Sequence, residues 1–93
     1  QDMLTKAKKL KIIDKYKTHE SDTGSPQVQI AILTAEIQYL TQHLRQHKKD
    51  FSSRRGLLKK VTERRRLMKY LERENLKSFK QLVEDLKIRI PKK

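Results

Sequence analysis

The segment from residue 26 to residue 46 carries apolar residues on two sides of a helix, and this pattern most constrains the fold. One stripe has a 3-4-3-4 spacing and consists of Ile30, Leu33, Ile37, Leu40 and Leu44. The other lies roughly 150° away at ~100° per residue, and consists of Val28, Ile32, Ala35 and Tyr39. A helix that is apolar on two sides has to be covered on two sides. We therefore predict that the fold is built around this central helix.

Three further segments have the apolar spacing of helices, over about residues 4–16, 52–73 and 75–90. Ser25 followed by Pro26 is typical of a helix start, Asn75 is a second candidate N-cap, and Pro91 is expected to end the last helix. The apolar residues predicted to be buried in the last two helices are Leu57, Leu58, Val61, Met68, Leu71, Leu76, Phe79, Leu82, Val83 and Leu86. The prediction is one all-α domain over 1–93 with four helices, dominated by a long antiparallel hairpin of the second and third.

Charge and composition narrow the class of partner. The 93 residues include 24 Lys and Arg against 11 Asp and Glu, which gives a formal net charge of +13. Cysteine is absent, so disulfides and thiolate chemistry are excluded, and two glycines leave no Gly-rich phosphate loop. We expect no membrane span and no secretory signal. A small basic helical chain of this kind is expected to bind a polyanion.

The positive charge is concentrated on the third helical segment. Residues 18–44 contain no Lys or Arg, whereas residues 45–69 contain eleven. One face, about 27 Å long by helical rise, holds only basic and neutral polar residues: Arg55, Lys59, Thr62, Arg66, Lys69, Tyr70 and Arg73. A solvated surface is the simple alternative, although such surfaces usually mix both signs. Arg64 projects onto the apolar side, where it either snorkels or meets Glu36 or Glu63.

The hairpin predicts two clusters of polar residues. With the turn centred near residue 49, residue 29 lies beside 69 and residue 43 beside 55. The first cluster consists of Thr23, Gly24, Gln29, Tyr70 and Arg73. The second consists of His43, His47, Asp50 and Ser53. A carboxylate among lysines and arginines would repel phosphate, but it could accept hydrogen bonds from base amino groups in a shallow minor groove.

Each of these residues also has a purely structural interpretation. Thr23 and Gly24 suit a turn, Gln29 a surface amide, and Asp50 or Ser53 an N-cap. His43 and His47 could be half of a metal site, but no cysteine or HExxH glutamate accompanies them. We find no set of nucleophile, base and orienting group on one face. The prediction is therefore a binding protein without cofactor or metal, and not an enzyme.

Four runs of sequence resemble the ribosomal protein S15 family in its bacterial form. They are residues 22–29 (DTGSPQVQ), 43–50 (HLRQHKKD), 53–58 (SRRGLL) and 64–71 (RRRLMKYL). The resemblance covers nearly the whole chain, with the motifs in order. It implies a primary rRNA-binding protein of the small subunit that grips a three-way junction in the central domain of 16S-type rRNA and a nearby minor groove.

The resemblance also implies residue roles and partners. Thr23, Gly24, Gln29, Arg66, Tyr70 and Arg73 match the family's junction contacts, and His43, Asp50 and Ser53, with His47 nearby, its minor-groove contacts. Further expectations are nucleation of platform assembly, an intersubunit bridge to large-subunit rRNA, and neighbouring platform proteins. We expect a monomer outside the ribosome, with no membrane and no small-molecule substrate.

The chain departs from the family pattern at two places. Phe51 and Ser52 stand where many members have His-His, and the usual C-terminal glycine is replaced near Lys87. The expected location is the cytoplasmic bacterial ribosome, with an organellar ribosome as the second option. Two other hypotheses share the charge: a non-specific DNA architectural or helix-turn-helix protein, and a basic amphipathic helix on a membrane surface.

Overall fold

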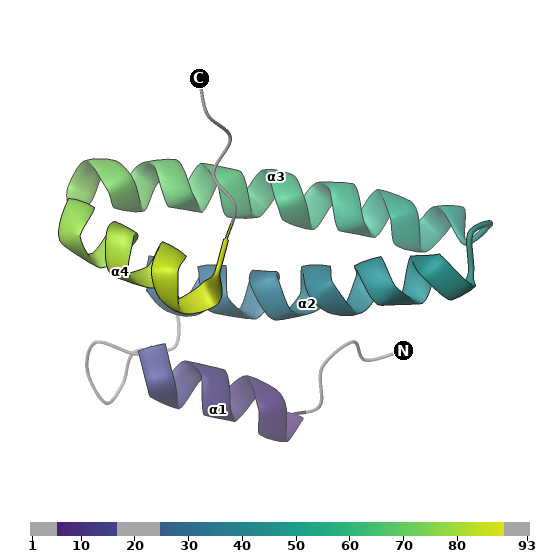
Figure 1. The fold of residues 1–93 in the computed structure, drawn as a ribbon, viewed down its shortest axis with the longest axis horizontal. Coiled ribbons are helices and arrows are strands. Elements are labelled where there is room, and N and C mark those ends of the chain that lie inside the picture. The colour runs from purple at the N-terminus through teal and green to yellow at the C-terminus, as the bar shows by residue number, and fades with distance from the viewer. Residues whose placement is uncertain (1–5, 17–24, 89–93) are drawn as a thin grey trace.

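The computed structural model describes residues 6–16 and 25–88, and these residues form four helices. They are α1 (Lys6–Tyr16), α2 (Pro26–Gln46), α3 (Phe51–Glu74) and α4 (Leu76–Leu86). Figure 1 shows α2 and α3 as a long antiparallel pair, with α1 against the side of α2 that faces away from α3. The short α4 folds back against both α2 and α3. The all-α prediction is confirmed, and α2 is covered on two sides as its two stripes required.

Short polar side chains start three of the helices. The Ser25 hydroxyl accepts a hydrogen bond from the backbone N–H of Val28 at 3.3 Å, ahead of proline in the first turn. Asn75 Oδ1 accepts from the N–H of Ser78 at 3.1 Å. Both predicted N-caps are confirmed. At α3 the cap is Asp50, whose Oδ1 accepts from the N–H of Ser53 at 3.0 Å.

The expectation that Pro91 ends the last helix is wrong. Helix α4 ends at Leu86, and Lys87 takes a left-handed backbone conformation with φ 53°. Its N–H bonds to the carbonyl of Glu84, and the N–H of Ile88 donates to the carbonyl of Val83 at 3.1 Å. This turn returns Ile88 to the core, where only 8% of it is exposed. A lysine therefore occupies the kind of helix end that favours glycine.

The main core lies at the end of the hairpin that α4 covers. Its buried residues are Ile30, Leu71, Phe79, Leu82 and Ile88, with Leu67, Met68, Val83 and Leu86 packed against them. Two residues predicted to be buried are not: Leu58 is 62% exposed and Leu76 49%. Helical periodicity placed both leucines near an apolar face of their helix. A residue on such a face is buried only where a neighbouring helix covers it. Among the described residues, α4 covers α3 only near its C-terminal end.

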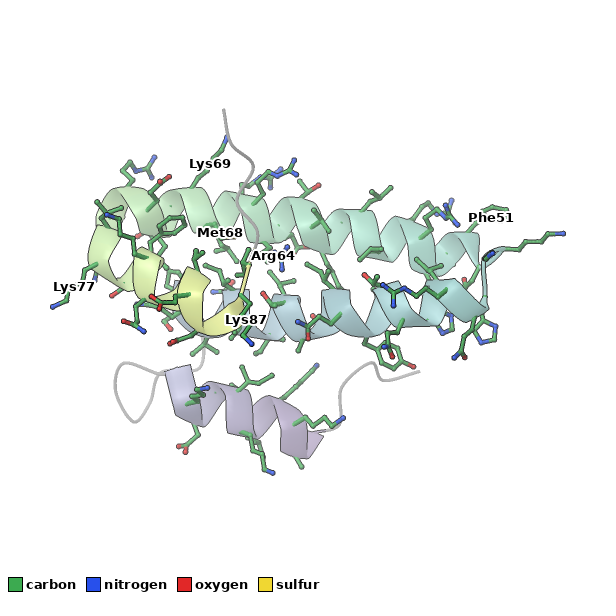
Figure 2. All side chains as sticks on the ribbon, in the orientation of Figure 1. Phe51, Arg64, Met68, Lys69, Lys77 and Lys87 are labelled. Atoms are coloured by element: carbon green, nitrogen blue, oxygen red, sulfur yellow. The ribbon has the colours of Figure 1, made fainter. Side chains whose placement is uncertain are left out.

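The middle of the hairpin interface contains two polar pairs. Lys60 pairs with Glu36 at 3.2 Å, and Arg64 donates to the Thr34 hydroxyl at 3.2 Å. These pairs confirm the predicted register. Arg64 does not meet a carboxylate, because Glu36 is paired with Lys60. Figure 2 shows Arg64 pointing toward α2, and its partial burial, followed by the nearby Arg65 charge, lowers the pKa of its guanidinium.

Candidate nucleic-acid interface

The predicted basic face of α3 is exposed along its whole length. Its members Arg55, Lys59, Thr62, Arg66, Lys69, Tyr70 and Arg73 are all exposed, and Figure 2 shows Lys69 pointing away from α2. Within the part of the chain that the structure describes, Arg55, Lys59, Arg66 and Lys69 form no ion pair. A row of cations without carboxylate partners has its full charge available to a polyanion.

One end of this face holds an aromatic ring beside a guanidinium. Arg73 lies over the Tyr70 ring, 5.6 Å from its centroid, and also donates to Glu74 at 3.3 Å. Gln29 is exposed in the first turns of α2, at this same end of the antiparallel hairpin. Thr23 and Gly24 lie outside the described residues. Of the first predicted cluster, the structure therefore places Gln29, Tyr70 and Arg73 at one end.

The second predicted cluster is centred on the Asp50 carboxylate at the turn. Besides the backbone of Ser53, Asp50 accepts from the Ser53 hydroxyl at 2.7 Å and from His43 Nε2 at 2.8 Å. The hydrogen bonds from Ser53, and then the one from His43, hold the pKa of Asp50 far below its usual range. The carboxylate is thus ionised at neutral pH, while its side chain remains 33% exposed. Its role as the N-cap of α3 brings Asp50 to Ser53, and the turn between the helices brings it to His43.

The ionised carboxylate decides which groups the cluster presents to a partner. His43 Nε2 must carry a proton to donate to it, and in the tautomer that carries its proton on Nε2 the other ring nitrogen, Nδ1, is an acceptor. The Ser53 hydroxyl donates its proton to Asp50. The lone pairs of this hydroxyl therefore remain available to accept a hydrogen bond from a partner. A carboxylate has about four acceptor positions, and Ser53 and His43 occupy three of them. The cluster therefore offers acceptors in a strongly basic neighbourhood.

A column of rings along α2 supports His43. The Tyr39 and His43 rings are 6.3 Å apart with planes at 15°, and the His43 and His47 rings are 4.6 Å apart at 31°. Sequence analysis did not select Tyr39 as a site residue, although its i, i+4, i+8 spacing with the histidines was visible. No group of three metal-ligating side chains occurs among the described residues. The three rings of Tyr39, His43 and His47 thus follow one another along the same face of α2.

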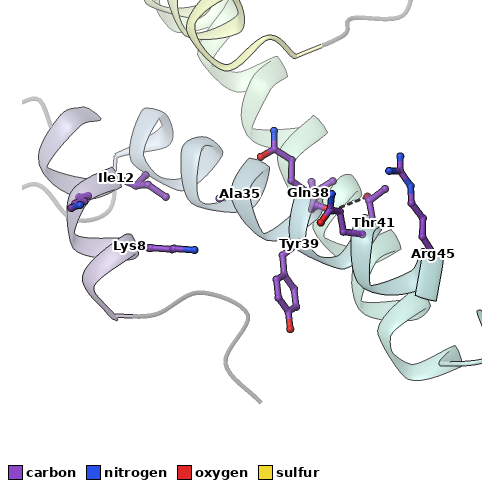
Figure 3. Close-up of a pocket in the computed structure, with 10 residues that line it drawn as sticks. Lys8, Ile12, Ala35, Gln38, Tyr39, Thr41 and Arg45 are labelled. Atoms are coloured by element: carbon purple, nitrogen blue, oxygen red, sulfur yellow. Dashed lines mark hydrogen bonds between the residues drawn. The ribbon is translucent and has the colours of Figure 1, made fainter. Parts of the chain in front are cut away.

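Several hollows border α2, and two of them differ in how they relate to the predicted site. The one beside the Asp50 cluster lies between α2 and α3 and is lined by Tyr39, Leu40, His43, Ser52, Ser53, Gly56 and Lys60. The other is a groove between α1 and α2, whose basic lining residues are Lys8, Lys11 and Arg45 (Figure 3). No described helix is long and apolar enough to cross a membrane. Of these two, the first adjoins residues that sequence analysis selected, and a further hollow at the turn is lined by the selected residues His43, His47 and Asp50.

Comparison with known proteins identifies the family. The family model described as Ribosomal protein S15 matches residues 8–89. The chain belongs to the ribosomal protein S15 family. This membership confirms the resemblance drawn from the four sequence runs. Members of the family are structural, non-enzymatic proteins, which agrees with the expectation that the chain is not an enzyme.

Curated relatives match over nearly their whole length. Small ribosomal subunit protein uS15 of Carboxydothermus hydrogenoformans is 57% identical over 86 residues, which are 92% of this chain and 97% of the relative. The protein of the same name from Trichlorobacter lovleyi is 58% identical over 87 residues, 94% and 99% of the two chains. That of Lysinibacillus sphaericus is 56% identical over 86 residues, 92% and 97% of the two chains. These relatives are bacterial-type proteins of the small subunit.

Proposed function

We propose that this chain is a structural constituent of a bacterial-type small ribosomal subunit that binds 16S-type rRNA at two places. One end of the hairpin binds a three-way junction in the central domain of the rRNA, through Gln29, Arg66, Tyr70 and Arg73. The turn end, with His43, Asp50 and Ser53, takes a minor groove of one arm. The exposed basic face between them, including Arg55 and Lys59, holds the phosphates. Thr23, Gly24 and His47 complete the proposed contacts.

The observation that carries this proposal is the acceptor cluster amid uncompensated cations. Counterion release from the basic face supplies affinity for any nucleic acid, without regard to sequence. Asp50, His43 and Ser53 add acceptors suited to donors in a groove, such as the guanine amino group and ribose hydroxyls. The A-form minor groove is wide and shallow, so side chains as short as serine and aspartate can reach its edges.

Further partners follow from the same assignment. Bound at a junction, the protein would nucleate platform assembly, contact neighbouring small-subunit proteins and add a bridge to large-subunit rRNA. A monomer outside the ribosome and a bacterial cytoplasmic location belong to the same proposal, with an organellar ribosome as the alternative. Family membership in bacterial-type S15 proteins supports this set of partners.

A competition titration across salt tests the proposal. The labelled RNA is a three-way junction with its minor-groove arm, and the competitors are the same RNA with the junction closed and duplex DNA. Contact with about five to eight phosphates gives a slope of log K against log salt of about −4 to −7. We expect the junction RNA to bind about 10³-fold more tightly at physiological salt. Equal competition by all three would instead support a non-specific DNA architectural protein.

Two carboxylate variants separate groove contacts from simple charge. Asp50→Ala and Glu63→Ala each raise the net charge by one, and both sites lie at or within α3, but Glu63 is exposed on the helix surface away from the turn. We expect Asp50→Ala to weaken junction binding and Glu63→Ala to leave it equal or tighter. Asp50→Asn, which keeps a capping oxygen, controls for loss of the helix start. Unchanged binding by Asp50→Ala would refute the groove contact.

A further inference from the structure

Nothing in the described fold requires a glycine at position 56. It is the sixth residue of the 24-residue helix α3, and its φ is not positive, so its backbone does not require glycine. A Cβ built on it would meet no atom within 4 Å. Glycine inside a helix lowers stability relative to alanine. Neither conformation nor packing within the described residues explains why a side chain is missing here.

Position 56, which lacks a side chain, lies on the floor of the hollow beside the Asp50 cluster. Gly56 lines this hollow together with Ser53 one turn earlier on α3 and Lys60 one turn later. From α2, Tyr39 and His43 form the opposite wall. His43 and Ser53 therefore line the same hollow as the bare backbone of Gly56.

We infer that Gly56 is a specificity-determining residue of the RNA interface, because its bare backbone lets the groove of the RNA arm come down onto α3. This inference rests on the proposed function. Ser53 and Asp50 have short side chains, so they reach base edges only if the RNA lies almost in contact with the helix. Any side chain at position 56 would stand between the helix and the ribose-phosphate strand that borders the groove.

The charges around the hollow favour RNA as the occupant. Lys48, Lys49, Arg54 and Arg55 surround the turn, and they are all exposed. Glu36, which is nearly buried, is already paired with Lys60, and Asp50 is engaged by Ser53 and His43. A positively charged rim around a bare stretch of helix suits a phosphate backbone at close range.

The test uses a series at this one position in the full chain. Gly56→Ala and Gly56→Gln are titrated against the junction RNA and against the same RNA with its minor-groove arm truncated. We expect both variants to melt at the same temperature as the wild type or higher, because helix propensity improves. We expect arm-dependent affinity to fall about tenfold or more with alanine and further with glutamine, as overpacking of a close contact predicts.

The truncated RNA is the matched control, since it lacks only the surface that Gly56 would touch. Affinity for it should be the same for all three proteins. If the wild type prefers the complete RNA and Gly56→Gln keeps that preference, the inference about Gly56 is overturned while the proposed function stands. If both RNAs lose affinity equally, the variant acts on the whole interface and the inference also fails. A wild type without preference for the arm overturns the proposed function together with this inference.

Discussion

The two ends of the α2–α3 hairpin are held together by different forces. At the end covered by α4, Ile30, Leu71 and Phe79 are buried in an apolar core. At the turn end Phe51 is 65% exposed, and hydrogen bonds to Asp50 tie α2 to α3. Among the described helices, α4 adds its apolar side chains to the core at one end of the hairpin only.

This difference separates stability from recognition along one pair of helices. Closely packed apolar side chains tolerate few changes, so the covered end is suited to holding the fold. The turn end keeps its polar groups in place through hydrogen bonds while leaving them accessible to a partner. The same carboxylate that caps α3 can therefore also face a ligand.

The largest expected effect comes from truncating the same type of ring at the two ends. Phe79→Ala should lower the free energy of unfolding by about 3–5 kcal/mol, because it removes a ring from the core. Phe51→Ala, at an exposed ring, should change it by about 0.5 kcal/mol or less. Chemical denaturation followed by circular dichroism measures both. If Phe79→Ala fails to fold, Phe79→Leu replaces it in the comparison and should lower the free energy of unfolding by about 1 kcal/mol. Equal effects at positions 51 and 79 would contradict the difference between the two ends.

An intermediate effect is expected at the polar pairs in the middle of the hairpin. Glu36→Ala leaves the partly buried Lys60 ammonium without its partner, which should cost about 1–3 kcal/mol. Lys60→Met and the double variant complete a mutant cycle. Because both charges are then gone, the double variant should be more stable than the sum of the single effects predicts. Strictly additive effects would show that Glu36 and Lys60 have no coupling energy.

The smallest stability effect, and the one that depends on pH, is expected at the turn. The pKa of Asp50 is lower in the folded protein than in the unfolded chain. The unfolded chain therefore binds the proton more tightly than the folded protein does. As a result, Asp50 stabilises the fold above its unfolded pKa of about 3.9. It is lost as the pH falls below that value. The wild type should therefore melt higher than Asp50→Ala at pH 7, with the gap narrowing toward pH 3. A difference in melting temperature that does not change with pH would show that the ionised carboxylate does not stabilise the turn. Glu63→Ala, which removes an exposed carboxylate elsewhere on α3, is the control.

Much of the fold could be predicted from particular residues. Ser25 and Asn75 carry capping side chains, so the starts of α2 and α4 were local properties of the sequence. The end of α4 was not, because the left-handed turn at Lys87 is stabilised by burial of Ile88, which no local pattern records. Leu58 and Leu76 were misplaced for the same reason: their exposure depends on which helix lies opposite.

The site was predictable where helical spacing and the register of a simple hairpin together brought residues close. His43, Asp50 and Ser53 followed from the register of an antiparallel hairpin, and the structure joins them by hydrogen bonds. The partner of Arg64 did not follow, since two polar acceptors, Glu36 and Thr34, lay within reach of the same interface. Choosing between them required the positions of Lys60 and Arg64 side by side on α3.

The sequence by itself determined that the chain is helical, basic on one face of α3 and a member of its family, because periodicity, charge and motifs are properties of residue order. Only the tertiary structure decided which apolar residues are covered, which oxygen meets Arg64 and which groups around Asp50 remain available as acceptors. Those outcomes depend on competition between neighbours that are distant in the chain. Burial and hydrogen bonding are settled by what lies opposite a side chain in space, and helical spacing fixes only the direction in which that side chain points.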